Sequence, residues 1–413
     1  MRTLYFLCNI ITVNMFTIIA KTSCEWCDRA KELLDDLEYT YTVKSYDSLD
    51  DVRRDLGDVI PADRIRSFPI VFRDGVLIGG YTNLRDRLTE PILMPDAERF
   101  AAFPIQYPAI YNLYKKHVAS FWTSDEISLA DDAAGFEQLT ENERKFLLHV
   151  LAFFSQADGI VLKNINMNFQ NEVTLFESTL FYSIQSFMEA EHSITYAQLI
   201  DALVQDTKDR NRLLNAIEYV PGVRAKAKWA EKWLDPSRSF AERLVAFACV
   251  EGILFSGSFC SIYWLKTRVS MPGLSLSNQF ISRDEKMHVD HAVALFKMLT
   301  NKPALSTVHK IVKEAVDNEV TFITDALPTR LVGMNSDAMT TYIQFVADSL
   351  LMDLGYDTLY DVECPFSFMQ NLGLEGKTNF FESRASEYAR AGVMAHDETP
   401  RNETDTSSDE DDF

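Results

Sequence analysis

A four-residue pattern, Glu-x-x-His, occurs twice in the chain and constrains its fold more than any other feature. The two copies are Glu189-Ala-Glu-His192 and Glu285-Lys-Met-His288, and both lie in segments with helical periodicity. Residues three apart lie on one face of a helix, so each copy presents a carboxylate and an imidazole side by side. One copy alone is usually a solvated helix face, so the repetition is what indicates a buried site.

Each copy follows a predicted helix that carries an acid inside an apolar run, Asp158 in the first case and Glu251 in the second. An uncompensated buried carboxylate costs several kcal/mol, so such acids are usually paired or bound to a metal. Four carboxylates and two imidazoles suit iron or manganese better than structural zinc, and this four-helix arrangement is a known pattern of di-iron carboxylate proteins. The sequence therefore predicts a di-metal site with the ligands Asp158, Glu189, His192, Glu251, Glu285 and His288.

Two residues near this pattern are alternatives to be weighed. Glu191 competes with Glu189 as a ligand, and the three-residue spacing to His192 favours Glu189. His291 follows His288 by one helical turn and could approach the site, but we expect it beside the ligands or at the surface.

Helical periodicity dominates the chain from about residue 109 to about residue 355. Capping boxes that begin at Thr140 and Ser239 open helices expected to reach about Asn168 and Arg268. The helices that carry the Glu-x-x-His copies are expected over about 172–204 and 276–300.

The N-terminal part instead alternates strand and helix patterns up to about residue 88. Strands are predicted over 16–20, 39–43, 70–72 and 76–78, with a helix over 27–37 and an Asp74-Gly75 hairpin turn. Four prolines between residues 89 and 108 predict a non-helical connector to the helical part.

Net charge and the lengths of the apolar stretches argue against several functions. The net charge of −21 makes a nucleic-acid partner a poor candidate. Residues 397–413 hold eight acids against Arg401 alone and predict a disordered acidic tail. We expect no membrane span, because no uninterrupted apolar stretch reaches roughly 20 residues. The apolar run from Leu4 to Ala20 could be a signal peptide, but two asparagines interrupt it and the first strand needs its second half.

The helical part resembles the small subunit of class I ribonucleotide reductases over residues 90–413, in stretches such as 103–107, 120–123, 150–154, 250–259 and 281–285. The resemblance implies the six ligands named above and a di-iron centre, with manganese as an alternative. It implies that Tyr196, one helical turn after His192, carries a stable radical. Phe255, Phe259 and Ile281 match the apolar pocket that protects this radical in the family.

The same resemblance implies a large subunit that receives the radical. The matching relay positions are Trp122, Asp284, His192 and, near the C-terminus, Tyr388. The segment Asp409–Phe413 is similar to the family's docking peptide, an acidic stretch with an aromatic end, although a purely solvating tail is the alternative. A homodimer is also implied.

A second resemblance rests on Lys21-Thr-Ser-Cys24-Glu-Trp-Cys27, which follows a strand and opens a helix. A thiol there feels the helix N-terminus, so Cys24 is the predicted nucleophile and Cys27 the resolving thiol. The unit resembles glutaredoxin over residues 15–88, although Glu25-Trp26 replaces the usual Pro-Tyr. The resemblance implies glutathione contacts at the cis-proline loop and at a glycine turn, which match Ser67, Phe68, Pro69, Gly79 and Gly80. Half of a zinc site is the alternative, but no second Cys/His pair lies nearby.

The expected fold is a thioredoxin-like α/β domain (15–88), a linker (89–108), an all-α ferritin-like bundle (109–385) and a disordered acidic tail (386–413), with residues 1–14 unassigned. The expected function is that of a cytoplasmic ribonucleoside-diphosphate reductase small subunit. Its fused dithiol domain would re-reduce the enzyme at high local concentration. A ferritin-like di-metal oxidase or oxygenase acting without a large subunit is the alternative, and an iron-storage or scaffolding protein is a third.

Overall fold

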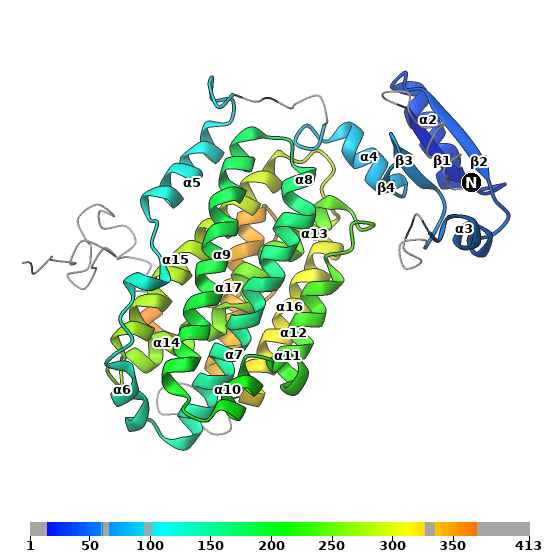
Figure 1. The fold of residues 1–413 in the computed structure, drawn as a ribbon. Helices are drawn as coiled ribbons and strands as arrows, with labels where there is room; N and C mark the ends of the chain where they lie inside the picture. The colour runs from blue at the N-terminus through cyan, green and yellow to red at the C-terminus, as the bar shows by residue number, and fades with distance from the viewer. Residues whose placement is uncertain are drawn as a thin grey trace, which may run out of the picture.

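Two domains make up the described part of the chain, a small α/β domain and a long helical bundle (Figure 1). This computed structural model describes residues 15–58, 60, 66–94, 99, 101–326 and 335–369. Tyr388, the acidic tail and residues 1–14 lie outside this part.

The α/β domain is built on a four-stranded sheet of order β2-β1-β3-β4, formed by β1 (Phe16–Ala20), β2 (Tyr41–Ser45), β3 (Ile70–Arg73) and β4 (Val76–Gly79). Strand β1 pairs parallel with β2 and antiparallel with β3. All five β1 side chains are buried, because helices cover both faces of this central strand. The helices are α2 (Glu25–Asp36), α3 (Leu49–Leu56) and α4 (Tyr81–Thr89).

The predicted hairpin joins β3 to β4. Its turn residues, Asp74 and Gly75, both have positive φ angles, 50° and 83°. These values suit a tight two-residue hairpin turn, for which Asp-Gly is a preferred sequence. The strand predicted over 39–43 begins two residues later, at Tyr41.

The connector precedes the bundle. The described connector residues 90–94 and 101–107 contain no helix. The α-helices of the bundle are α5 (Pro108–Ala119), α6 (Asp132–Gln138), α7 (Glu141–Asn164), α8 (Gln170–Glu172), α9 (Phe176–Leu203), α10 (Thr207–Leu213), α11 (Ala216–Tyr219), α12 (Pro221–Lys232), α13 (Phe240–Cys249), α14 (Ser256–Lys266), α15 (Pro272–Met298), α16 (Leu305–Ala326) and α17 (Ser336–Leu354). A 3₁₀ turn, η3 (Ser124–Glu126), and two π-helical segments, η4 (Ile165–Phe169) and η5 (Val250–Leu254), complete it.

The π-helical segments correct two sequence expectations. The helix expected from Ser239 to Arg268 is divided into α13, η5 and α14, with a break at Phe255. The helix expected to reach Asn168 leaves α-geometry after Asn164. An extra residue in one turn does not change which residues are apolar, so periodicity alone does not reveal it.

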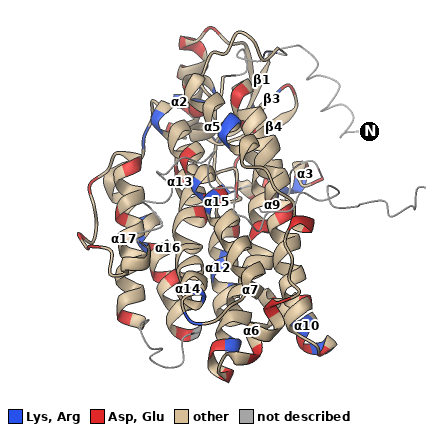
Figure 2. Cartoon of the chain, turned by 90° about the vertical axis from the view of Figure 1, so that its left-hand side faces the viewer, with Lys and Arg blue, Asp and Glu red and all other residues tan. Residues whose placement is uncertain are grey.

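Two helical stretches, 141–172 and 240–266, are apolar and long enough to pass a test for membrane spans. The most apolar part of the second is 94% buried inside the fold, and in the first the buried share is 56%. They carry Asp158 and Glu251, so they are core helices of the bundle. Acidic and basic residues are scattered over the remaining helices and loops (Figure 2).

Polar contacts join the two domains along α4, which lies between the sheet and the bundle (Figure 1). The Asn83 side-chain amide donates to the carbonyls of Pro236, at 2.6 Å, and Arg238, at 3.2 Å. The Glu90 carboxylate accepts the backbone N–H groups of Thr300 and Asn301 at 2.7 and 2.6 Å. The connector is therefore anchored to the bundle at its beginning.

Candidate di-metal centre

Four helical segments carry the six predicted ligands into the middle of the bundle. Asp158 comes from α7, Glu189 and His192 from α9, Glu251 from η5, and Glu285 and His288 from α15. All six residues are at most 2% exposed. The one-turn spacing within α9 and α15 directs each Glu-x-x-His copy inward, as the sequence predicts.

The six side chains form two overlapping groups. One contains Glu189, Glu251, Glu285 and His288, the other Asp158, Glu189 and His192, and within each group one atom per residue lies within 4.8 Å of the others. The Nδ1 atom of His288 lies 3.0 Å from a Glu189 oxygen, and that of His192 lies 3.1 Å from a Glu285 oxygen. Because Glu189 belongs to both groups, the arrangement suits two adjacent metal positions.

The polar atoms of this cluster fit metal ions. Both carboxylate oxygens of Asp158 are buried and have no hydrogen-bond partner among the described residues. Such atoms are costly unless a cation compensates them. Oxygen ligands with two imidazoles suit iron or manganese, so the residues fit a di-iron or di-manganese centre.

Burial and neighbouring charges shift the pKa values of the cluster in both directions. Burial raises the pKa of Asp158 and of Glu285 well above the ordinary value, and nearby carboxylates add to the effect. Burial also opposes charge on Glu189, but the two imidazoles outweigh it and lower the pKa of Glu189 to about 2. Burial is likewise outweighed at His288, where Glu189 helps to raise the pKa to about 10. Metal ions would displace the protons held in this cluster.

The two alternatives weighed at the sequence level lie outside both groups. The Glu191 carboxylate accepts the backbone N–H of Ser124 at 2.7 Å. His291 is buried, stacks on Phe181 with ring centroids 4.1 Å apart, and has its Nε2 3.1 Å from Ser178 Oγ. It lies beside the ligands, which is one of the two positions expected for it.

Two neighbours of the cluster were missed at the sequence level. His117 on α5 has its Nε2 3.0 Å from the Nε2 of His288, on the side away from the carboxylates. Nothing in the sequence around His117 distinguishes it. Gln185 donates to Glu251 at 3.2 Å, and its place four residues before Glu189 on α9 could have indicated it.

Tyr196 lies one turn after His192 on α9 in an aromatic pocket. Its ring stacks on Phe154, with centroids 4.6 Å apart and planes 4° from parallel. Phe154 in turn contacts Phe255 and Phe259. Tyr196 is 1% exposed, and its hydroxyl has no hydrogen-bond partner among the described residues. Burial raises the pKa of the Tyr196 phenol well above its ordinary value.

Three predicted relay residues also meet. The Trp122 indole N–H donates to the Asp284 carboxylate at 2.7 Å, and the same oxygen lies 3.3 Å from His192 Nε2. The rings of Trp122 and His192 stack with centroids 5.9 Å apart. Burial opposes charge on Asp284, but Arg283, together with the hydrogen bond to His192 and the nearby imidazoles, outweighs it and lowers the pKa of Asp284. A continuous path therefore leads from the metal cluster to Trp122.

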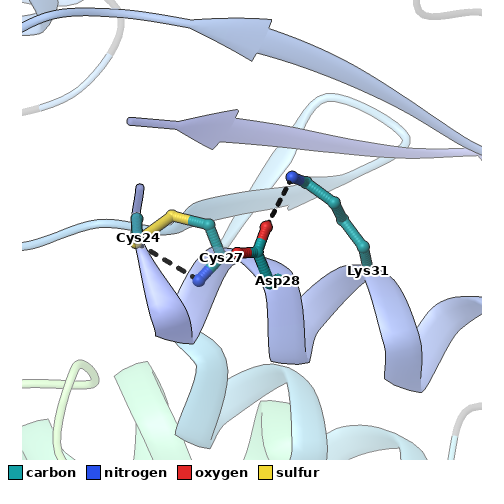
Figure 3. The surroundings of a disulfide bond; sticks show 4 residues. All are labelled: Cys24, Cys27, Asp28 and Lys31. Carbon is teal, nitrogen blue, oxygen red and sulfur yellow. Dashed lines mark hydrogen bonds and ion pairs between the residues drawn. A yellow bond between two sulfur atoms is a disulfide. The ribbon is translucent and has the colours of Figure 1, made fainter. Parts of the chain in front are cut away.

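The two cysteines of the N-terminal domain form a disulfide at the start of α2 (Figure 3). Cys24 caps the helix, because its sulfur accepts the backbone N–H of Cys27 at 3.2 Å. Cys27 is fully buried and Cys24 partly exposed, which suits an attacking Cys24. The acid that departs from the glutaredoxin pattern, Glu25, pairs with Arg29 at 2.8 Å. The other cysteines described, Cys249, Cys260 and Cys364, form no disulfide.

The predicted cis-proline loop is present, because the bond between Phe68 and Pro69 is cis. The Gly79-Gly80 turn begins α4, where the Asn83 side chain accepts the Gly80 N–H at 3.1 Å. Gly79 and Asn83 also line a cavity of about 170 Å³ between the two domains. The glycine turn thus faces the bundle on one side, which the sequence did not indicate.

Replacing Glu285 by Ala should lower metal affinity by more than the ~10–100-fold typical of losing an outer hydrogen-bond partner, because a charged ligand is removed. Metal content after dialysis, measured by elemental analysis, checks this. Glu191→Ala is the matched control and should retain full metal content. Full occupancy in Glu285→Ala would count heavily against the assignment.

Comparison with known proteins agrees with this geometry. Residues 99–365 match the family model of the ribonucleotide reductase small chain, and residues 14–78 match glutaredoxin. The chain is 53% identical to ribonucleoside-diphosphate reductase subunit M2 of Danio rerio over 307 residues, 74% of this chain and 80% of that protein. It is 52% identical to the small chain of Nicotiana tabacum over 74% of this chain and 93% of that one.

Solved structures show the same fold. The ribonucleotide reductase Rnr4 homodimer of Saccharomyces cerevisiae matches with a TM-score of 0.63 and 35% identity, over 71% of this chain and 95% of that one. The dimanganese NrdF of Streptococcus sanguinis matches in fold, with a TM-score of 0.57, 17% identity and coverage of 67% of this chain and 99% of that one. The chain therefore belongs to the ribonucleotide reductase small-chain family, as a ribonucleoside-diphosphate reductase small subunit with an N-terminal glutaredoxin domain.

Proposed function

We propose that this small subunit generates a stable radical on Tyr196 and passes its oxidising equivalent to a large subunit that reduces ribonucleoside diphosphates. The observation that carries the proposal is the closed aromatic pocket that holds Tyr196 one helical turn from the metal cluster. A core tyrosine without this function would not need a buried six-residue cluster with uncompensated carboxylate oxygens beside it.

The metal pair would be held by Asp158, Glu189, His192, Glu251, Glu285 and His288. When bound, it supplies the oxidation that removes one electron from the phenol. Burial keeps the Tyr196 phenol protonated until that step, at which it loses an electron and a proton. The rings of Phe154, Phe255 and Phe259 then exclude water and reductants from the phenoxyl oxygen.

The radical leaves and returns through His192, Asp284 and Trp122 in this proposal. The hydrogen bonds at 2.7 and 3.3 Å between these groups support it, because they couple electron and proton positions along one path. Tyr388 would continue the relay toward the large subunit, and the segment 409–413 would dock there. Both lie outside the described residues and rest on the resemblance alone.

A second copy of the chain is the proposed partner of an exposed apolar face. Val118, Phe121, Phe187 and Ile194 lie exposed on and next to α5 and α9, and the rings of Phe121 and Phe187 are 5.4 Å apart. Exposed apolar surface of this kind marks interaction sites, and the yeast relative is a homodimer. Sedimentation of the purified chain as a monomer would contradict this.

The glutaredoxin domain is proposed to re-reduce the large subunit after turnover. The Cys24 thiolate attacks the substrate disulfide, which releases one substrate thiol and leaves the other in a mixed disulfide with Cys24. Cys27 then attacks Cys24 and releases the second substrate thiol. Two electrons and two protons pass to the substrate, which leaves the Cys24–Cys27 disulfide seen here. Two glutathione molecules would restore the dithiol and form glutathione disulfide. The partly exposed Cys24 and buried Cys27 support these roles.

The iron-loaded chain, mixed with its large subunit, should give a tyrosyl EPR signal and reduce ribonucleoside diphosphates. A chain that lacks Asp409–Phe413 should keep the signal and lose turnover. The acidic residues of this segment are expected to steer docking, and the Phe413 ring to fill a pocket on the large subunit. Undiminished turnover by the truncated chain would exclude the tail as anchor. A full-length chain with bound iron and no tyrosyl signal would disprove the radical role.

A further inference from the structure

A buried ion pair lies within the bundle, apart from the metal cluster. Lys226 on α12 and Glu319 on α16 are joined at 2.5 Å, and both side chains are 0% exposed. Removing two charges from water is costly, and one Coulombic contact repays it only when further hydrogen bonds satisfy both groups. The partners that supply those hydrogen bonds indicate what the ion pair does.

All of these partners lie at one break in a helix. Lys226 donates to the carbonyl of Leu254, the last residue of η5, at 2.5 Å. Glu319 accepts the backbone N–H of Gly257 at 3.1 Å and also that of Ser258. These N–H groups belong to the first turn of α14, whose own N-cap residue, Phe255, supplies no side-chain cap.

The ion pair therefore caps both sides of the break at Phe255. The Lys226 ammonium satisfies a carbonyl at the end of η5, and the Glu319 carboxylate satisfies N–H groups at the start of α14. The helix dipole favours a positive charge at a C-terminal end, where Lys226 lies, and a negative charge at an N-terminal end, where Glu319 lies. Gly257 allows the approach, because a Cβ atom there would lie 2.6 Å from a Glu319 oxygen.

The break itself joins two functional parts. Glu251 lies in η5, immediately before it, and Phe255 and Phe259 lie at and after it, against the ring that stacks on Tyr196. We infer that Lys226 and Glu319 are positioning residues, which fix the break and thereby hold Glu251 and the wall of the Tyr196 pocket in place. The part that concerns the pocket rests on the proposed radical function.

The test replaces the ion pair by apolar side chains in Lys226→Met/Glu319→Leu. Because buried ion pairs are often replaceable by apolar residues without loss of stability, this variant should fold. Amide exchange of residues 250–259 in the metal-free protein should become at least tenfold faster. After iron loading, the tyrosyl radical should decay at least tenfold faster. The matched control is Lys232→Met/Glu314→Leu, which removes a partly exposed pair at 2.7 Å on the same two helices and should change neither rate.

A folded double variant with unchanged amide exchange and unchanged radical decay would overturn the inference. Faster exchange with unchanged decay would overturn its functional part. If the parent chain gives no tyrosyl signal, the radical proposal fails, whereas the exchange measurement still decides the capping role. Should the double variant not fold, Glu319→Gln takes its place. It keeps an oxygen for the Gly257 N–H but removes the charge, and unchanged exchange there would also overturn the inference.

Discussion

Tyr196→Phe is expected to abolish the tyrosyl EPR signal and ribonucleotide reduction together, while metal content stays that of the unaltered chain. Only the phenolic oxygen is removed, and the ring that stacks on Phe154 remains. The hydroxyl has no hydrogen-bond partner among the described residues, so its loss leaves no donor or acceptor stranded and should change stability little. EPR, elemental analysis and a thermal melt measure the three quantities on one preparation.

The same helix provides a matched control for this substitution. Tyr182 on α9 is also buried, and its hydroxyl likewise lacks a partner among the described residues. Tyr182→Phe should keep the signal, the metal and the activity. A tyrosyl signal that persists in Tyr196→Phe would place the radical on another residue.

The second large effect is expected at the N-terminal dithiol. With glutathione and its reductase as the sole reductant, Cys24→Ser should stop turnover after the first cycles, because serine gives no nucleophilic anion at neutral pH where cysteine gives a thiolate. Metal content and the radical should be unaffected, since Cys24 caps the start of α2 in the other domain. A chemical dithiol should restore turnover.

Cys27→Ser separates two routes of disulfide reduction. It removes the resolving thiol but leaves Cys24 able to form a mixed disulfide with glutathione, so partial activity through that one-thiol route should survive. If Cys24→Ser supported undiminished multiple turnovers with glutathione, the domain would not be the reductant. It would then be better interpreted as a docking or regulatory domain.

The sequence predicted those parts of the cluster that depend on spacing along one helix. Glu189 and His192 share a face because they are one turn apart, and the repetition of the pattern, each time after an apolar helix with an acid, is what indicated a buried site. The structure brings all six predicted side chains together, and their role as ligands stays a prediction. The domain boundaries proposed at residues 88, 108 and 385 also stay predictions.

Contacts between distant segments could not be predicted in this way. His117 meets His288 across 171 residues of sequence, and no local pattern records that approach. The break at Phe255 depends on Lys226 and Glu319, which come from two other helices. Side-chain type and periodicity describe one element at a time, whereas these features arise only when elements pack.

The contacts of Asn83 and Glu90 with the bundle have a consequence for the proposed reduction of a partner disulfide. A reductase joined by a slack tether could swing toward its substrate. Here Asn83 on α4 and Glu90 after it are hydrogen-bonded to the bundle, and Cys24 caps the start of α2 in the same small domain. If the domain acts as the proposed reductant from this position, a substrate disulfide on a mobile segment of the partner would reach Cys24 more easily than a disulfide on a rigid surface.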